Sequence, residues 1–189
     1  ILPPKVAENK LVIVPIYNKE NKDKIMKKAL EIKKKLTKFN PILDEREGYS
    51  IGWKFNEWEL KGIPLRIELG PKDLTKKQVV LVRRDNGKKE NVGFARLLTK
   101  VDSSLENMQK DLFEKAKDFI KKNTVEVKTI NDFEKEVKKN KLIKTFWCGC
   151  DEDKIKDKFG VKILNIPFDQ PKNKNKCIFC NKEGNLAYI

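Results

Sequence analysis

The chain has 189 residues, enough for one or two domains, and carries a formal net charge of +15. Charged residues make up 38% and hydrophobic residues 39% of the chain, so a hydrophobic core can form and wholesale disorder is not expected. Histidine is absent, which excludes Ser–His and Cys–His nucleophilic catalysis, histidine proton relays and histidine metal ligands. The expected function therefore shifts from catalysis towards binding.

The positive charge favours a polyanionic partner that is bound through phosphate contacts and counterion release. An alternative remains open, because lysine-rich chains also carry charge for solubility or heat tolerance. Residues 141–189 have a net charge of +4, which leaves +11 for residues 1–140, so the charge is not confined to a tail. We find no signal peptide, no apolar run of membrane-spanning length and no basic amphipathic helix with an aromatic apolar face. We therefore expect a cytoplasmic protein without a membrane partner.

The first third of the chain predicts a βαβ unit. The continuous apolar run at residues 11–16 is typical of a strand that is buried on both faces. Ile25, Ala29, Ile32 and Leu36 then follow at helical spacing with lysines between them. A second strand opens at Ile42, so the two strands are expected to pair in parallel.

The middle of the chain predicts a short helix and three more strands. The helix covers residues 53–60 and ends at Gly62. Residues 65–69 alternate strictly, so Arg66 and Glu68 face away from the apolar side of that strand. A buried run at 79–82 leads into a hairpin turn at residues 85–88, followed by a return strand.

The last part of the chain predicts a small α/β region. Residues 103–122 are expected to form a long helix, residues 125–127 a brief strand and residues 131–140 another helix. Further strands are expected at 144–147 and within 162–167.

Four cysteines near the C-terminal end form two short pairs, Cys148 with Cys150 and Cys177 with Cys180. Four soft ligands in two chelating turns suit a tetrahedral structural zinc ion, and the 26 residues between the pairs can form a small module around it. The C-x-C spacing of the first pair is tighter than usual, and two disulfides are the alternative. A catalytic zinc is not expected, since such sites keep an open position and often use histidine.

Several segments resemble the C-terminal part of prolyl-tRNA synthetase. The block GWKFNEWELKGIPLRIELGPKDL at residues 52–74, the start LPPKV with the strand at 11–16, and VLVRRD at 80–85 resemble its anticodon-binding domain. The cysteine module with IPFDQP at 166–171 is similar to the zinc-binding C-terminal domain of the archaeal and eukaryotic type. The resemblance covers nearly the whole chain.

The resemblance implies an α/β fold. It consists of a mixed five-stranded sheet with flanking helices, the class II synthetase anticodon-binding fold, at residues 1–102, and a small α/β zinc-binding domain at residues 103–189. It also implies that a class II aminoacylation domain, with ATP and magnesium, would precede Ile1, so this part alone is expected to be inactive. The implied partners are proline tRNA, the enzyme's own catalytic domain and a second subunit of a homodimer.

Two departures from the family pattern are visible. The family usually spaces its first cysteine pair more widely than here. It also tends to end on a tyrosine carboxylate, whereas this chain ends at Tyr188-Ile189, and we assign Tyr188 no role.

The resemblance also assigns anticodon-binding residues, because proline anticodons share two guanines. Phe55 is the implied stacking platform, while Glu59 and Asp73 are the implied acceptors for the guanine edge. The implied cationic donors to base or phosphate are Arg66, Lys72 and Lys88. The residues agree in part, since Phe55 and Glu59 are four apart and share a helix face. Trp53 and Trp58 are expected to pack, and Glu68 to orient Arg66 or Arg84.

Each assignment has a simpler alternative. Phe55 could belong to the core, and Lys88 could be a solvated hairpin lysine. Glu59, Arg66 and Asp73 could form an ordinary surface charge network. For the whole chain, the alternative function is a free-standing zinc-stabilised RNA-binding or scaffold protein. A thiol redox protein or an independent enzyme has little support.

Overall fold

The computed structural model describes residues 2–172 and 175–189. The chain forms two compact units, residues 1–114 and 115–189. The first boundary residue of the predicted second domain, Ser103, lies within helix α4 (Leu97–Asn123). The functional boundary after residue 102 therefore stays a prediction.

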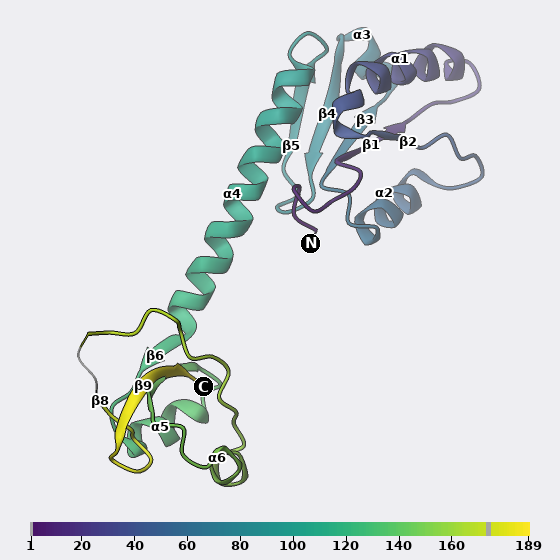
Figure 1. Ribbon diagram of the computed structural model, residues 1–189. Coiled ribbons are helices and arrows are strands. Elements are labelled where there is room, and N and C mark those ends of the chain that lie inside the picture. Colours follow the sequence, from purple (N-terminus) through teal and green to yellow (C-terminus); the bar gives the residue numbers. More distant parts are fainter. Residues whose placement is uncertain (1, 173–174) are drawn as a thin grey trace. The chain divides into compact units, whose positions relative to one another are not determined.

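The first unit contains a five-stranded mixed sheet in the order β2-β1-β3-β4-β5, which confirms the expected fold (Figure 1). Its strands are β1 (Leu11–Pro15), β2 (Ile42–Leu43), β3 (Leu65–Leu69), β4 (Gln78–Arg83) and β5 (Lys89–Gly93). Strand β1 pairs in parallel with β2, as the βαβ pattern predicted, and also with β3, whereas β3, β4 and β5 are antiparallel.

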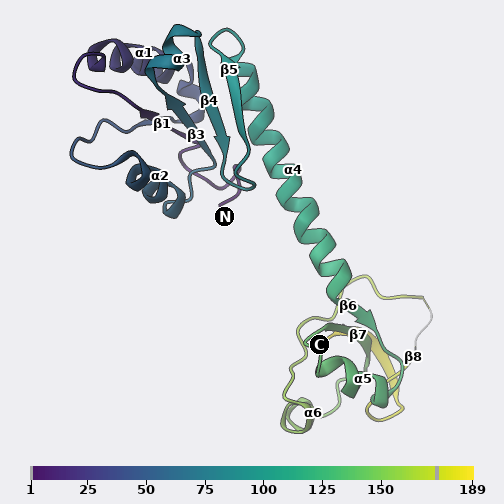
Figure 2. The ribbon, with the colours of Figure 1, turned by 180° about the vertical axis from the view of Figure 1, so that it is seen from behind.

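Helices cover both faces of this sheet. On one face, Leu65, Ile67 and Leu69 of β3 pack with apolar residues of α1 (Lys22–Lys35) and of the first part of α4. On the other face, Val12 and Val14 of β1 pack with residues of α2 (Ile51–Leu60). Seen from either side, α2 and the short helix α3 (Pro71–Thr75) lie towards opposite ends of β3 (Figures 1 and 2). A single-turn 3-10 helix, Thr37–Phe39, precedes β2.

The helix boundaries differ from the predicted ones for local reasons. Helix α2 begins two residues early, because the Ser50 hydroxyl accepts the main-chain N–H of Trp53 and caps the helix. Residues 72–73 form part of α3 rather than a plain turn, since Pro71 occupies the first helical position, where its missing N–H is not needed. Helix α4 starts at Leu97, six residues earlier than expected, and buries Leu97 and Val101 in the first unit.

The second unit contains a four-stranded sheet in the order β6-β7-β9-β8. Its strands are β6 (Thr124–Glu126), β7 (Leu142–Trp147), β8 (Asn175–Lys176) and β9 (Glu183–Tyr188), and its helices are α5 (Ile130–Val137) and α6 (Glu152–Phe159). The rings of Phe159 and Phe179 both meet the buried Phe133 edge-on, at centroid distances of 5.3 and 5.2 Å. These contacts join α5 and α6 to the loop between β8 and β9.

The strand predicted within residues 162–167 is wrong. This segment touches β9 only at an isolated bridge between Asn165 and Tyr188, and Leu164 and Ile166 are exposed. Pro167 has no N–H with which to extend a ladder. Beyond it, the side-chain amide of Gln170 both donates to the main-chain oxygen of Leu186 at 3.2 Å and accepts its N–H at 2.7 Å.

Within residues 2–172 and 175–189, we find no helix whose length and apolar character would let it cross a membrane.

Candidate nucleic-acid interface and metal centre

Helix α2 covers the β1 side of its sheet face, and charged residues occupy the β3–β5 side of the same face. Register places Arg66 of β3 opposite Val82 of β4, which in turn lies opposite Lys89 of β5. Glu68 follows two residues after Arg66 and therefore faces the same way. The sheet thus presents Arg66, Glu68 and Lys89 on one face.

Arg66 is the centre of this charged group. Its Nη1 donates to Glu59 Oε1 at 2.7 Å and its Nε to Glu68 Oε1 at 3.1 Å. Lys89 Nζ lies 3.4 Å from the same Glu68 oxygen. Glu68 is buried, so its carboxylate holds Arg66 from beneath, and the expected orienting contact between these two residues is present.

Phe55 lies against the guanidinium of Arg66, whose central carbon is 3.9 Å from the ring centroid. The ring is only partly buried, and it also packs on the apolar cluster of Val12, Val14 and Ile63. Phe55 therefore contributes to the packing of α2 and, through Arg66, to the exposed charged face.

Buried polar contacts fix helix α2 to the end of β2. The Asp44 side chain is fully buried, and it accepts two hydrogen bonds from the Arg46 guanidinium and one from Trp58 Nε1. Lys54 Nζ lies 3.8 Å from its other oxygen. Because Lys54 and Trp58 are on α2, these bonds set the position of the helix that carries Phe55 and Glu59.

Lys72 and Asp73 lie beyond the opposite end of β3. The strand from Leu65 to Leu69 spans roughly 13 Å at 3.3 Å per residue, so these side chains are not grouped with Glu59. Asp73 Oδ2 accepts a hydrogen bond from the main-chain N–H of Gly70 at 3.0 Å and so stabilises the N-terminus of α3. An alanine at Asp73 would therefore remove a structural bond as well as an acceptor for a base.

Lys88 lies in the turn that joins β4 to β5, and this confirms the predicted hairpin. Its main-chain N–H donates to Asn86 Oδ1, while its side chain is exposed. Since Leu65 pairs with Arg83, this turn adjoins the same end of β3 as Glu59. The structure therefore gathers Phe55, Glu59 and Arg66, with Lys88 nearby, whereas Lys72 and Asp73 form a separate group.

Two charged residues near this group were not among the predicted anticodon-binding residues. Lys89 contacts Glu68, and Arg84 Nε donates to the main-chain oxygen of Glu59 at 2.9 Å. Strand alternation could have predicted that the Lys89 side chain faces this group. Arg84 follows the end of β4, where the alternation of side chains no longer predicts which way a side chain points.

The four cysteines meet in the second unit. Cys148 and Cys150 follow β7, whereas Cys177 and Cys180 lie between β8 and β9. Pairing of Trp147 in β7 with Asn185 in β9 brings the two loops together. The tight C-x-C turn is possible because Gly149 adopts a φ of +82°, which favours glycine.

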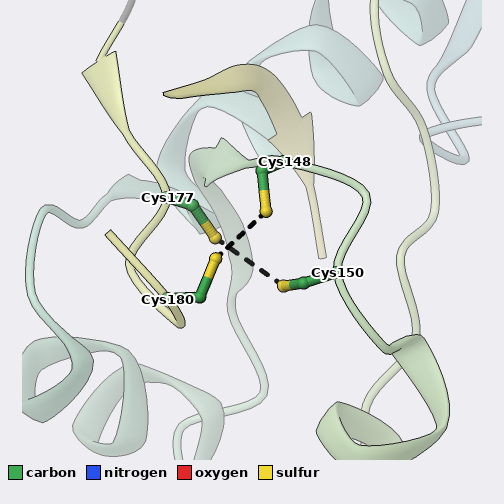
Figure 3. Close-up of side chains that lie close together, drawn as sticks. All are labelled: Cys148, Cys150, Cys177 and Cys180. Carbon is green, nitrogen blue, oxygen red and sulfur yellow. Dashed lines mark hydrogen bonds between the residues drawn. The ribbon is translucent and has the colours of Figure 1, made fainter. Parts of the chain in front are cut away.

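The four sulfur atoms point towards a common centre and lie within 4.8 Å of one another (Figure 3). The Sγ–Sγ distances are 3.1 Å for Cys148 with Cys180 and 3.8 Å for Cys150 with Cys177, far longer than the about 2.05 Å of a disulfide bond. A tetrahedral site with metal–sulfur bonds of about 2.3 Å separates its sulfurs by about 3.8 Å. The donor set and its size therefore fit a single metal ion.

The thiols differ in their acidity. Burial, together with the neighbouring Cys148 and Cys177 thiols, raises the pKa of Cys150 to about 12. A main-chain hydrogen bond from Lys182, with a further bond from Cys148, lowers the pKa of Cys180 to about 7. A divalent cation would favour thiolates at all four positions, because only the thiolate is a strong ligand.

Comparison with known proteins identifies both regions. Residues 10–104 match the family model described as the anticodon binding domain. The chain belongs to the anticodon-binding domain family. Residues 130–189 match the model described as the C-terminal region of prolyl-tRNA synthetase.

Curated proline–tRNA ligases are similar to this chain along almost the full length of the chain. Identity is 41% over 188 residues with proline–tRNA ligase 2 of Bacillus cereus (strain ATCC 10987 / NRS 248), covering 97% of the chain and 39% of the relative. It is 42% over 196 residues with proline–tRNA ligase of Alkaliphilus oremlandii (strain OhILAs), covering 100% and 40%. The chain thus spans about two-fifths of the length of these relatives. These relatives come from bacteria, so the similarity to the archaeal and eukaryotic type is not confirmed.

Proposed function

We propose that this chain is the tRNA-recognising C-terminal portion of a proline–tRNA ligase and reads the guanines of the proline anticodon. The observation that carries the proposal is the cluster of Phe55, Glu59 and Arg66 on the charged face of the sheet, within the region that matches the anticodon-binding family. An aromatic ring, a carboxylate and a guanidinium are the groups needed to stack a splayed base and bind its edges.

Glu59 and Arg66 bind each other in the free protein, and guanine offers each of them a replacement partner. Guanine N1–H and N2–H can donate to the Glu59 carboxylate, while its O6 and N7 can accept from Arg66. Glu68 and Phe55 hold Arg66 when its bond to Glu59 opens. Lys72, Asp73 and Lys88 then serve neighbouring nucleotides, the lysines through phosphate contacts.

Aminoacylation belongs to the rest of the proposed enzyme. There a class II catalytic domain, using ATP and magnesium, would activate proline and transfer it to the tRNA, and the enzyme would act as a cytoplasmic homodimer. Anticodon contacts supply binding energy remote from that chemistry. In the second unit, Cys148, Cys150, Cys177 and Cys180 would hold a structural zinc ion, which fits the archaeal and eukaryotic architecture.

A binding comparison tests the proposal. The chain is titrated with a proline tRNA transcript and with one whose two anticodon guanines are replaced, at fixed moderate salt. We expect clear preference for the first transcript, and a Glu59→Gln change should lower that preference about 10- to 100-fold, because the amide presents a donor towards guanine N1–H. Lys72→Ala should weaken the binding of both transcripts by the same factor.

Glu57→Gln is the matched control, since Glu57 lies on the same helix but pairs with Lys61 at 2.8 Å. It should leave the preference unchanged. Equal binding of the two transcripts by the unmodified chain would contradict the proposal, and the +15 charge would then provide only generic phosphate affinity.

A further inference from the structure

Arg84 joins three elements around the end of helix α2. Its main-chain N–H donates to the Pro64 oxygen, just before β3, at 3.0 Å. Its side-chain Nε donates to the main-chain oxygen of Glu59 at 2.9 Å. The residue itself follows β4, so it ties the last turn of α2 to the start of β3 and to the β4–β5 hairpin.

The Glu59 oxygen is part of the motif that ends the helix. Gly62, at a φ of +83°, donates its N–H to this oxygen at 3.1 Å, and the N–H of Ile63 donates to Trp58. The Arg84 guanidinium adds a second, charged donor to the same oxygen, where the helix dipole is negative. The main chain of Glu59 is therefore fixed from two directions.

The Arg84 side chain as a whole is partly buried. Its Nη1 is buried, and within the described part of the chain it has no hydrogen-bond partner. Arg84 also lines a cavity of about 10 Å³, together with Trp58 and Arg66 among other residues. A buried unpaired donor lowers stability, so Nη1 offsets part of the stabilisation that the bond from Nε to the Glu59 oxygen provides.

We infer that Arg84 is a positioning residue for guanine recognition, which directs the Glu59 carboxylate by holding the main chain of Glu59. This inference rests on the proposed function, because Arg84 acts only through the contact proposed between Glu59 and guanine. Arg84 itself does not touch the base. The Glu59 side chain has few other constraints, since it is about half exposed and its partner Arg66 must be released on binding.

The test is a double-mutant cycle with Arg84→Met and Glu59→Gln in this chain. The readout is the ratio of dissociation constants for the guanine-replaced and the unmodified proline tRNA transcripts. We expect Arg84→Met to lower this ratio about three- to tenfold. The double variant should have the same ratio as Glu59→Gln alone, because a residue that acts through Glu59 has no effect once that carboxylate is gone.

Arg83→Met is the matched control. Arg83 is the adjacent residue, but its guanidinium binds Asp85 and Asp111 instead of α2. It should leave the ratio unchanged even if it lowers thermal stability. If Arg84→Met does not fold, Arg84→Lys keeps a cation near the Glu59 oxygen and should give an intermediate ratio.

Two results would overturn the inference alone. One is an unchanged ratio in the folded Arg84 variant, and the other is independent, multiplying effects of the two substitutions. If the unmodified chain shows no preference, or if Glu59→Gln leaves it intact, the assignment of Glu59 fails first and the role of Arg84 fails with it.

Discussion

Asp44 shows how a single buried carboxylate can determine the position of a helix. Burial alone would raise its pKa, but hydrogen bonds from Arg46 and Trp58 outweigh this effect and lower the pKa to about 2. The carboxylate therefore stabilises the fold above its unfolded pKa of about 4, and this contribution is lost as the pH falls towards 2.

Replacing Asp44 with asparagine should lower the free energy of unfolding by about 2 kcal/mol at pH 7, since the shift of nearly two pKa units disappears. Urea unfolding of both proteins at pH 7, 4 and 2 measures this difference. It should persist at pH 4 and become much smaller at pH 2. A difference that is the same at pH 2 as at pH 7 would contradict the assigned ionisation.

The candidate site was predictable from the sequence only where local periodicity fixes direction. Phe55 and Glu59 share a face because they are four apart on a helix, and Arg66 faces them because its strand alternates. The contact between Arg84 and Glu59 joins residues 25 apart. This contact depends on how the β4–β5 hairpin packs against the end of α2, and no local sequence pattern predicts that packing.

The predictability of each element depends on how strongly its sequence alternates or repeats. The β1 run and the α1 stripe were correct because they bury apolar residues at a regular spacing. Strand β9 was missed, since Glu183–Tyr188 contains glycine and asparagine and gains its order from pairing with β7. Helix α6 had signals that could have been used, namely the Asp151 cap and Gly160 at a φ of +71°.

Removing the metal should affect the elements that carry the cysteines and spare the first sheet. We expect a chelator to release about one zinc ion per chain and to abolish hydrogen-exchange protection of the β7–β9 pairing, because a small module relies on its metal for stability. Protection of β1 and β3 should not change. Cys177→Ser should reproduce the effect, whereas an unaltered exchange pattern after zinc removal would contradict a structural metal.

At the scale of the whole molecule, the charge is shared between the two units. Residues 1–114 have 25 basic and 17 acidic side chains, a net charge of +8, which leaves +7 for residues 115–189. The shorter second unit is therefore the more densely charged. Dividing the sequence at residue 140 gave the second part a lower net charge, because only the structure shows where the two units separate.

Binding to tRNA should therefore weaken steeply with salt. Plots of log affinity against log salt concentration for the proline transcript and its guanine-replaced version should be parallel lines, because phosphate contacts do not depend on base identity. Lys72→Ala should reduce both slopes by roughly one contact. Filter binding or anisotropy over a salt series measures these slopes, and lines of clearly different slope would contradict the separation of phosphate from base contacts.

The double hydrogen bond between Gln170 and Leu186 has a consequence for how the molecule meets its own copies. Among the described residues, the short strand β8 pairs with β9 at Gly184 and Glu183 and does not reach Leu186, whose main-chain donor and acceptor lie at the sheet margin. The Gln170 amide occupies both groups. A side chain thus takes the place of a strand at an edge where free main-chain groups would favour pairing with another copy.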